Sequence, residues 1–200
     1  MLERLNEETK PDHADADADI ERYLLMDPIT TDGYRTFLVR LYGFLIPLEA
    51  ALADTAGLGD FIDARSRSKA HLVVRDLHAL GLAPLTIGAL PQCETIPKFR
   101  SVATALGWMY VIERPLLASA VLKGHLATAL GREMIHAASY LTCYSGHVGT
   151  AWRELGEAMD SIAVTPQIAD RIVGAARDGF RCLRRWRTID LEAGRQLLVS

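Results

Sequence analysis

Residues 107–122 read GWMYVIERPLLASAVL, a long apolar pattern that charge and proline interrupt once. Glu113 and Arg114 stand together in the middle of it, and Pro115 follows them directly. Proline has no backbone N–H to donate and costs about 3 kcal/mol in a helix interior, unless it begins a new helical segment. We therefore expect a helix over 98–112, a break at Glu113 and Arg114, and a second helix over 115–130.

The rest of the chain shows the same helical pattern. Apolar residues recur at intervals of three and four residues, and no alternating, turn-bounded runs indicate a sheet. Further helices are expected from Thr31 to Leu52, with a kink or an end at Pro47, and over 66–80, 132–145, 149–162 and 166–189, with the longest loop over 84–97. Two hundred residues, half of them hydrophobic, are enough for one domain. The expected fold class is all-α, a single multi-helix domain over 1–200.

Composition narrows the classes of function. The formal net charge is −3 and the pI is about 6.1, so no global basic field favours a nucleic-acid partner. The start of the chain lacks the apolar core of a secretory signal, and no stretch reaches about 18 uncharged apolar residues. Cys93, Cys143 and Cys182 are widely separated, with no Cys-x-x-Cys spacing. A soluble cytoplasmic protein, without a nucleic-acid or membrane partner, is the expectation.

His13 lies in a short polar segment near the start of the chain, where residues 8–13 read ETKPDH. Thr9 and Asp12 have the spacing of a capping box, and Pro11 would occupy the first turn of the helix that follows. Read alone, this pattern favours a solvent-facing His13.

Four segments, taken in order, resemble the bacterial heme oxygenases. They are ETKPDH over 8–13, YRTFL with YGFLIPLE over 34–49, LGWMYVIE over 106–113, and MDSI over 159–162 followed by AARDGF over 175–180. The resemblance covers roughly residues 5 to 187. It implies a heme oxygenase-like helical bundle that opens heme with O₂ to biliverdin, iron and carbon monoxide. Heme is then both substrate and cofactor, and a reductase or ferredoxin supplies the electrons, because the chain has no flavin or iron–sulfur motif.

The resemblance changes the interpretation of the first helix. His13 matches the iron-binding histidine of the family, and Thr9 and Lys10 precede it at the family's offsets. Asp17, one helical turn later, is expected to accept a hydrogen bond from the second ring nitrogen and to orient the ring. Lys10 and Arg153 are the candidate anchors for the heme propionates, since the basic residues that some relatives use before Met159 are missing here.

The distal helix departs from the family pattern. The family has glycines that let the backbone approach the heme face, whereas this chain has Arg114 at the first of these positions and Ala118 and Ser119 at the later pair. Arg114 and Ser119 are the candidate catalytic residues of this altered wall, and Ala118 is a candidate heme contact. The Arg114 side chain has three possible places: in the pocket, against a carboxylate, or in solvent.

Two functions remain open at this point. The first is a heme oxygenase with His13 as the proximal ligand. The second is a non-catalytic protein on the same scaffold that binds heme or another small ligand, or regulates a partner. His13 favours the enzyme, whereas Arg114, Pro115 and the missing basic anchors favour the second.

Overall fold

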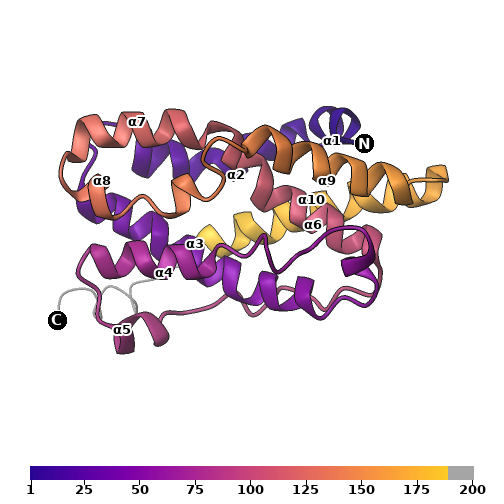
Figure 1. Cartoon of the computed structure of the whole chain (residues 1–200), viewed down its shortest axis with the longest axis horizontal. Helices are drawn as coiled ribbons and strands as arrows, with labels where there is room; N and C mark the ends of the chain where they lie inside the picture. Colours follow the sequence, from indigo (N-terminus) through magenta and orange to yellow (C-terminus); the bar gives the residue numbers. More distant parts are fainter. Residues whose placement is uncertain (189–200) are drawn as a thin grey trace.

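The computed structural model describes residues 1–188, and for residues 14–16 it describes the backbone only. Every regular element in this range is helical, which confirms the all-α class (Figure 1). The α-helices are α1 (Leu2–Glu8), α2 (Lys10–Ile20), α3 (Thr31–Ala53), α4 (Ala70–Ala79), α5 (Pro84–Gly88), α6 (Val102–Glu113), α7 (Ser119–Leu130), α8 (Glu133–His136), α9 (Val148–Ile162) and α10 (Pro166–Thr188). Shorter π or 3₁₀ segments are η1 (Glu21–Leu25), η2 (Leu58–Asp60), η3 (Arg114–Ala118) and η4 (Tyr140–Thr142). The last residue of the helix expected over 166–189, and the end of the domain expected over 1–200, lie outside the described residues.

α6 and α10 pack closely together in the middle of the molecule (Figure 1). Two glycines permit this approach. A Cβ atom on Gly107 would lie 2.4 Å from the Ile172 carbonyl oxygen, and one on Gly179 would lie 2.8 Å from Val111 Cγ2. Only glycine fits at such distances without a shift of the neighbouring helix. The position of α6, and therefore of the break that follows it, is fixed by this contact.

The expected break lies where the sequence places it. α6 ends at Glu113, the chain continues as the 3₁₀ segment η3 through Arg114 and Pro115, and α7 begins at Ser119. Pro115 lies in the first turn of η3, where its missing N–H costs little. The break is confirmed, but both helices begin later than expected, at Val102 and Ser119 instead of 98 and 115. η3 separates the side chains of α6 from those of α7.

α3 is 23 residues long and continues through Pro47, so this proline does not end the helix. Phe44 and Leu48, on either side of Pro47, are both buried in the core, and their packing stabilises the helix across the lost hydrogen bond. The start also differs slightly from expectation, since Thr30 is the cap and its Oγ1 accepts a hydrogen bond of 3.0 Å from the Gly33 amide.

Two helical stretches are long and apolar enough to cross a membrane, judged by length and composition alone. They are Thr31–Ala53 and Val102–Leu130, and 50% and 61% of their most apolar windows is buried inside the protein. α3 and α6 both pack against other helices of the bundle. Their apolar character therefore matches that of core helices.

Two other expectations about helices are corrected. The helix expected over 66–80 begins only at Ala70, because Glu49 Oε1 accepts the backbone amides of Lys69 and Ala70 at 2.7 and 3.0 Å and so caps the helix there. The loop expected over 84–97 contains the short helix α5, with Pro84 in its first turn.

The helix expected over 132–145 is also wrong. This segment contains α8 and η4 with a turn between them, because the carboxylate of Asp76 on α4 binds the chain at that point. Its two oxygens accept the backbone amides of Ser139 and Tyr140 at 2.7 and 2.8 Å. These bonds replace the helical ones that the periodicity predicted.

Candidate functional site

A cavity of about 770 Å³ lies between the first helices of the chain and α7. One wall comes from α2 and η1, and the other from the end of α6, η3 and α7; its lining side chains are mainly apolar, including Ile20, Leu25, Leu117, Ala118, Val121 and Leu122. We call this cavity the α2/α7 cleft. Its size lies within the range of small-molecule sites. α2, the helix that carries His13, lies opposite residues 114–122 across this cleft.

Arg114 crosses the α2/α7 cleft and pairs with Asp17. Its Nη1 lies 3.1 and 3.0 Å from the two carboxylate oxygens of Asp17, and the two side chains are 22% and 39% exposed. Of the three places open to Arg114, the structure therefore gives it the one against a carboxylate. The turn of η3 directs this side chain from one wall of the cleft to the other.

His13 lies behind this pair, in the core. It is 7% exposed, its ring centroid lies 5.5 Å from that of Phe180 and 6.4 Å from that of Tyr110, and Tyr110 lines the cleft. Its Nε2 lies 2.8 Å from Thr9 Oγ1. Thr9 donates its only hydroxyl hydrogen to the Leu5 carbonyl at 2.7 Å, so His13 Nε2 donates to Thr9 and a neutral ring carries its lone pair on Nδ1.

Burial and charge keep His13 neutral. Desolvation lowers the pKa of the imidazole, and the positive charge of Arg114 lowers it further, while Asp17 and Asp12 act in the opposite direction. A neutral imidazole is the form that binds iron. Thr9 does not form the capping box with Asp12, because its hydroxyl is used by Leu5 and His13.

Tyr110 is the site residue that the sequence did not single out. It contacts His13 from the cleft side, and its hydroxyl is buried without a hydrogen bond to any described residue. Burial raises the pKa of this phenol, an effect that the nearby Thr9 side chain and Arg114 partly offset. A buried, unpaired hydroxyl beside a cavity is a ready partner for a polar group of a ligand or for water.

The other predicted residues are divided between the cleft and the surface. Ala118 lines the cleft, as expected of a ligand contact, whereas Ser119 does not. Lys10 is exposed and outside the lining, and Arg153 donates a 3.3 Å hydrogen bond to Thr150 on the exposed side of α9. Asp17, expected to orient His13, has Arg114 as its recorded partner, and Thr9 takes the orienting position.

The sequence matches the heme oxygenase family model over residues 1–188. The chain belongs to the heme oxygenase family. The structure of the NO- and CO-bound heme oxygenase from Neisseria meningitidis is similar to this fold, with a TM-score of 0.67 and 23% identity, over 92% of this chain and 90% of that one. No curated protein sequence matches this chain significantly.

Family membership confirms the resemblance to heme oxygenases and gives the chain a heme oxygenase-like function. No finding favours the non-catalytic alternative. Arg114, at a position where the resemblance predicts glycine, forms an ion pair with Asp17 across the cleft.

Proposed function

We propose that this protein binds heme in the α2/α7 cleft, with His13 as the iron ligand, and opens it with O₂ to biliverdin, iron and carbon monoxide. The observation that carries the proposal is the cleft itself. An apolar cavity of about 770 Å³ has a neutral imidazole behind one wall and a cation across its width, in a chain whose first 188 residues match the heme oxygenase family.

The residues present fit heme by their chemistry. The apolar lining suits a porphyrin ring, because burial of such a ring removes a large apolar area from water. Arg114 offers a planar cation that matches a propionate carboxylate. The bound heme would supply the redox-active iron and would itself be the substrate, whereas the protein would hold, orient and desolvate it.

The ion pair across the cleft has to separate for heme to bind in this way. A propionate would replace the Asp17 carboxylate as the partner of Arg114, so one carboxylate contact is exchanged for another and the cation is never left unpaired. His13 would also release Thr9 if Nε2 is the iron-binding nitrogen, whereas Nδ1 is free of hydrogen bonds within the described residues.

The finer expectations are part of the same proposal. Ala118 would form the distal wall with Arg114. Lys10 and Arg153 as propionate anchors, and Ser119 as part of that wall, would have to move toward the ligand, because all three lie outside the cleft lining. A cytoplasmic reductase or ferredoxin would donate electrons to this bacterial-type enzyme, whose single domain would span 1–200.

Turnover tests the proposal directly. The purified protein is incubated with hemin and a supplied ferredoxin and its reductase, and biliverdin is followed by absorbance and carbon monoxide by trapping. We expect product from the parent and from the control His78→Ala, whose histidine is exposed and outside the cleft. His13→Ala is expected to lose most of the activity while keeping its helical circular dichroism. Equal turnover by His13→Ala would show that His13 is not the iron ligand. The absence of product from a hemin-loaded parent would overturn the proposed reaction.

A further inference from the structure

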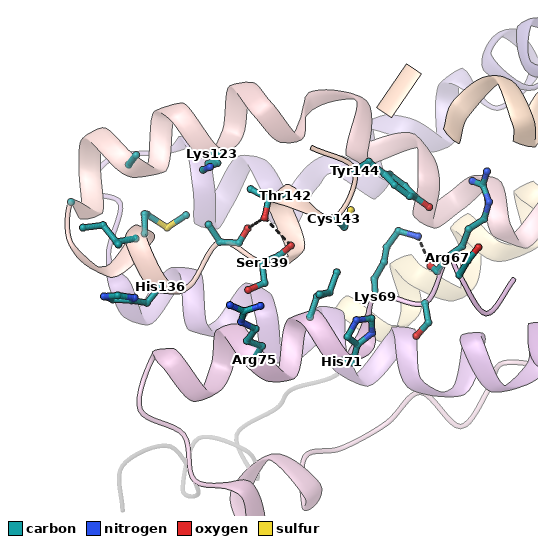
Figure 2. A pocket seen from close by; sticks show the side chains of 18 residues that line it. Arg67, Lys69, His71, Arg75, Lys123, His136, Ser139, Thr142, Cys143 and Tyr144 are labelled. Atoms are coloured by element: carbon teal, nitrogen blue, oxygen red, sulfur yellow. Dashed lines mark hydrogen bonds between the residues drawn. The ribbon is translucent and has the colours of Figure 1, made fainter. Parts of the chain in front are cut away.

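A second cavity of about 710 Å³ lies on another side of α7 (Figure 2). Its walls come from α4, from α7, and from the segment that runs from α8 to Tyr144. None of its lining residues lines the α2/α7 cleft. On α7, Lys123 and Ala127 belong to this second cavity, whereas Val121 and Leu122 belong to the cleft. We call it the basic pocket.

The basic pocket concentrates positive charge on a protein that is acidic as a whole. Arg67, Lys69, Arg75 and Lys123 line it, together with His71 and His136, and no aspartate or glutamate is among the lining residues. The chain carries a formal charge of −3, so this local excess runs against the overall charge. A concave surface lined by one sign of charge attracts ligands of the opposite sign.

The two buried cations share one buried carboxylate at the end of the pocket. Lys69 Nζ lies 2.8 Å from Glu113 Oε1, and these side chains are 1% and 4% exposed. Arg67 Nη2 lies 2.8 Å from the more exposed Glu154, but Arg67 Nη1 is only within 3.7 Å of Glu113. Although Arg67 is buried, its Nη1 makes no hydrogen bond to a described residue. Nη1 therefore has an ionic neighbour in Glu113 but lacks a hydrogen-bond acceptor among the described residues, and it can donate to a ligand.

The two exposed cations, Arg75 and Lys123, make no side-chain hydrogen bond or ion pair within residues 1–188, although the charge of Arg75 acts on the neighbouring Asp76. Figure 2 shows Arg75 on α4 and Lys123 on α7 on opposite sides of the hollow, with Ser139 and Thr142 between them. The neighbouring Asp76 is fully buried, and its oxygens accept the Ser139 and Tyr140 amides. The charge of Arg75 and Lys123 therefore remains for a ligand.

We propose that the basic pocket binds a small polyanion that carries phosphate or carboxylate groups, with Arg75 and Lys123 as its main contacts and Arg67 Nη1 as a donor at the buried end. Two walls that present separate cations suit a ligand with at least two anionic groups, because one group can meet each wall. The proposal is independent of heme, since the pocket and the cleft share no lining residue.

Isothermal titration of the full chain at low ionic strength tests this site, with pyrophosphate as the phosphate probe and citrate as the carboxylate probe. We expect saturable one-to-one binding of at least one probe. The double substitution Arg75→Glu with Lys123→Glu should weaken it by at least about tenfold, the size of effect expected when charge-assisted contacts become repulsive.

The matched control is Lys98→Glu with Arg100→Glu, which makes the same change in net charge on exposed residues outside the pocket. It should leave binding nearly unchanged. Pyrophosphate binding alone would assign the site to phosphate compounds, and citrate binding alone would assign it to carboxylates. The proposal is overturned if neither probe saturates, or if the control pair weakens binding as much as the pocket pair does.

Discussion

The two cavities beside α7 differ in whether their charged side chains are already paired within the protein. In the α2/α7 cleft, the cation that crosses the space is already matched, since Arg114 meets both oxygens of Asp17. In the basic pocket, the buried cations Arg67 and Lys69 are paired with glutamates, whereas the exposed Arg75 and Lys123 make no hydrogen bond or ion pair within residues 1–188. The cleft therefore needs a ligand that competes with an internal carboxylate, whereas the basic pocket needs only an anion from outside.

Glu113 connects the two regions, because it ends α6 just before Arg114 and accepts from Lys69 beside the basic pocket. Its Oε1 also accepts a 3.0 Å hydrogen bond from the Tyr144 hydroxyl. Glu113→Gln should leave Lys69 buried without a carboxylate and should lower the free energy of unfolding by about 3–5 kcal/mol. Urea denaturation followed by circular dichroism measures this loss.

Glu154→Gln is the control for that change. Glu154 also pairs with Arg67, but its carboxylate side chain is 58% exposed, so its loss should cost less than about 1 kcal/mol. Similar values for the two variants would mean that burial does not distinguish these ion pairs, and that Lys69 does not depend on Glu113.

The role of the Arg114–Asp17 ion pair across the cleft is tested by Asp17→Asn, which keeps the shape of the side chain and removes its charge. Arg114 then has a weaker internal partner and is free for a propionate, so the affinity for hemin should rise by about tenfold, or about 1.4 kcal/mol. Absorbance titration measures it. Asp54→Asn, the same substitution at an exposed residue outside the cleft, should leave the affinity as it is. A weaker affinity in Asp17→Asn would show that Asp17 supports the heme site instead of competing for it.

Ionic strength should affect ligand binding differently at the α2/α7 cleft and at the basic pocket. This is the smallest of the expected effects. The Debye length falls from about 30 Å at 0.01 M salt to about 8 Å near 0.15 M. Binding of pyrophosphate or citrate to the exposed cations should weaken severalfold over this range. Hemin binding should change less, because apolar burial in the cleft supplies most of its free energy. An equal loss at both sites would contradict the contrast between them.

The features that depend on local chemistry could be predicted from the sequence. The break before α7 was predictable because Pro115 lacks a backbone N–H and follows two charged residues, although α3 shows at Pro47 that packing can carry a helix past a proline. His13 became a candidate because the segments around it resemble the family in order. The role of Thr9 was only partly predictable. Its position suggested a cap, but the hydroxyl holds His13, which depends on the Leu5 carbonyl one turn earlier.

The contacts between distant segments could not be predicted from the sequence. Arg114 and Asp17 are 97 residues apart, and the basic pocket joins Arg75 and Lys123 only because α4 and α7 line the same hollow. The cysteines show the same limit. Cys93 and Cys182 seemed unrelated by spacing, yet their sulfur atoms lie 3.7 Å apart as free thiols in the core.

The central claim is that the α2/α7 cleft is a heme site with His13 as the iron ligand. The most direct measurement is the Soret spectrum during titration of the parent protein and His13→Ala with hemin. We expect one-to-one saturation of the parent, with a low-spin spectrum that is shifted or lost in His13→Ala while the helical content stays the same. A parent that shows no Soret change at stoichiometric hemin, or a His13→Ala variant with the spectrum of the parent, would contradict it.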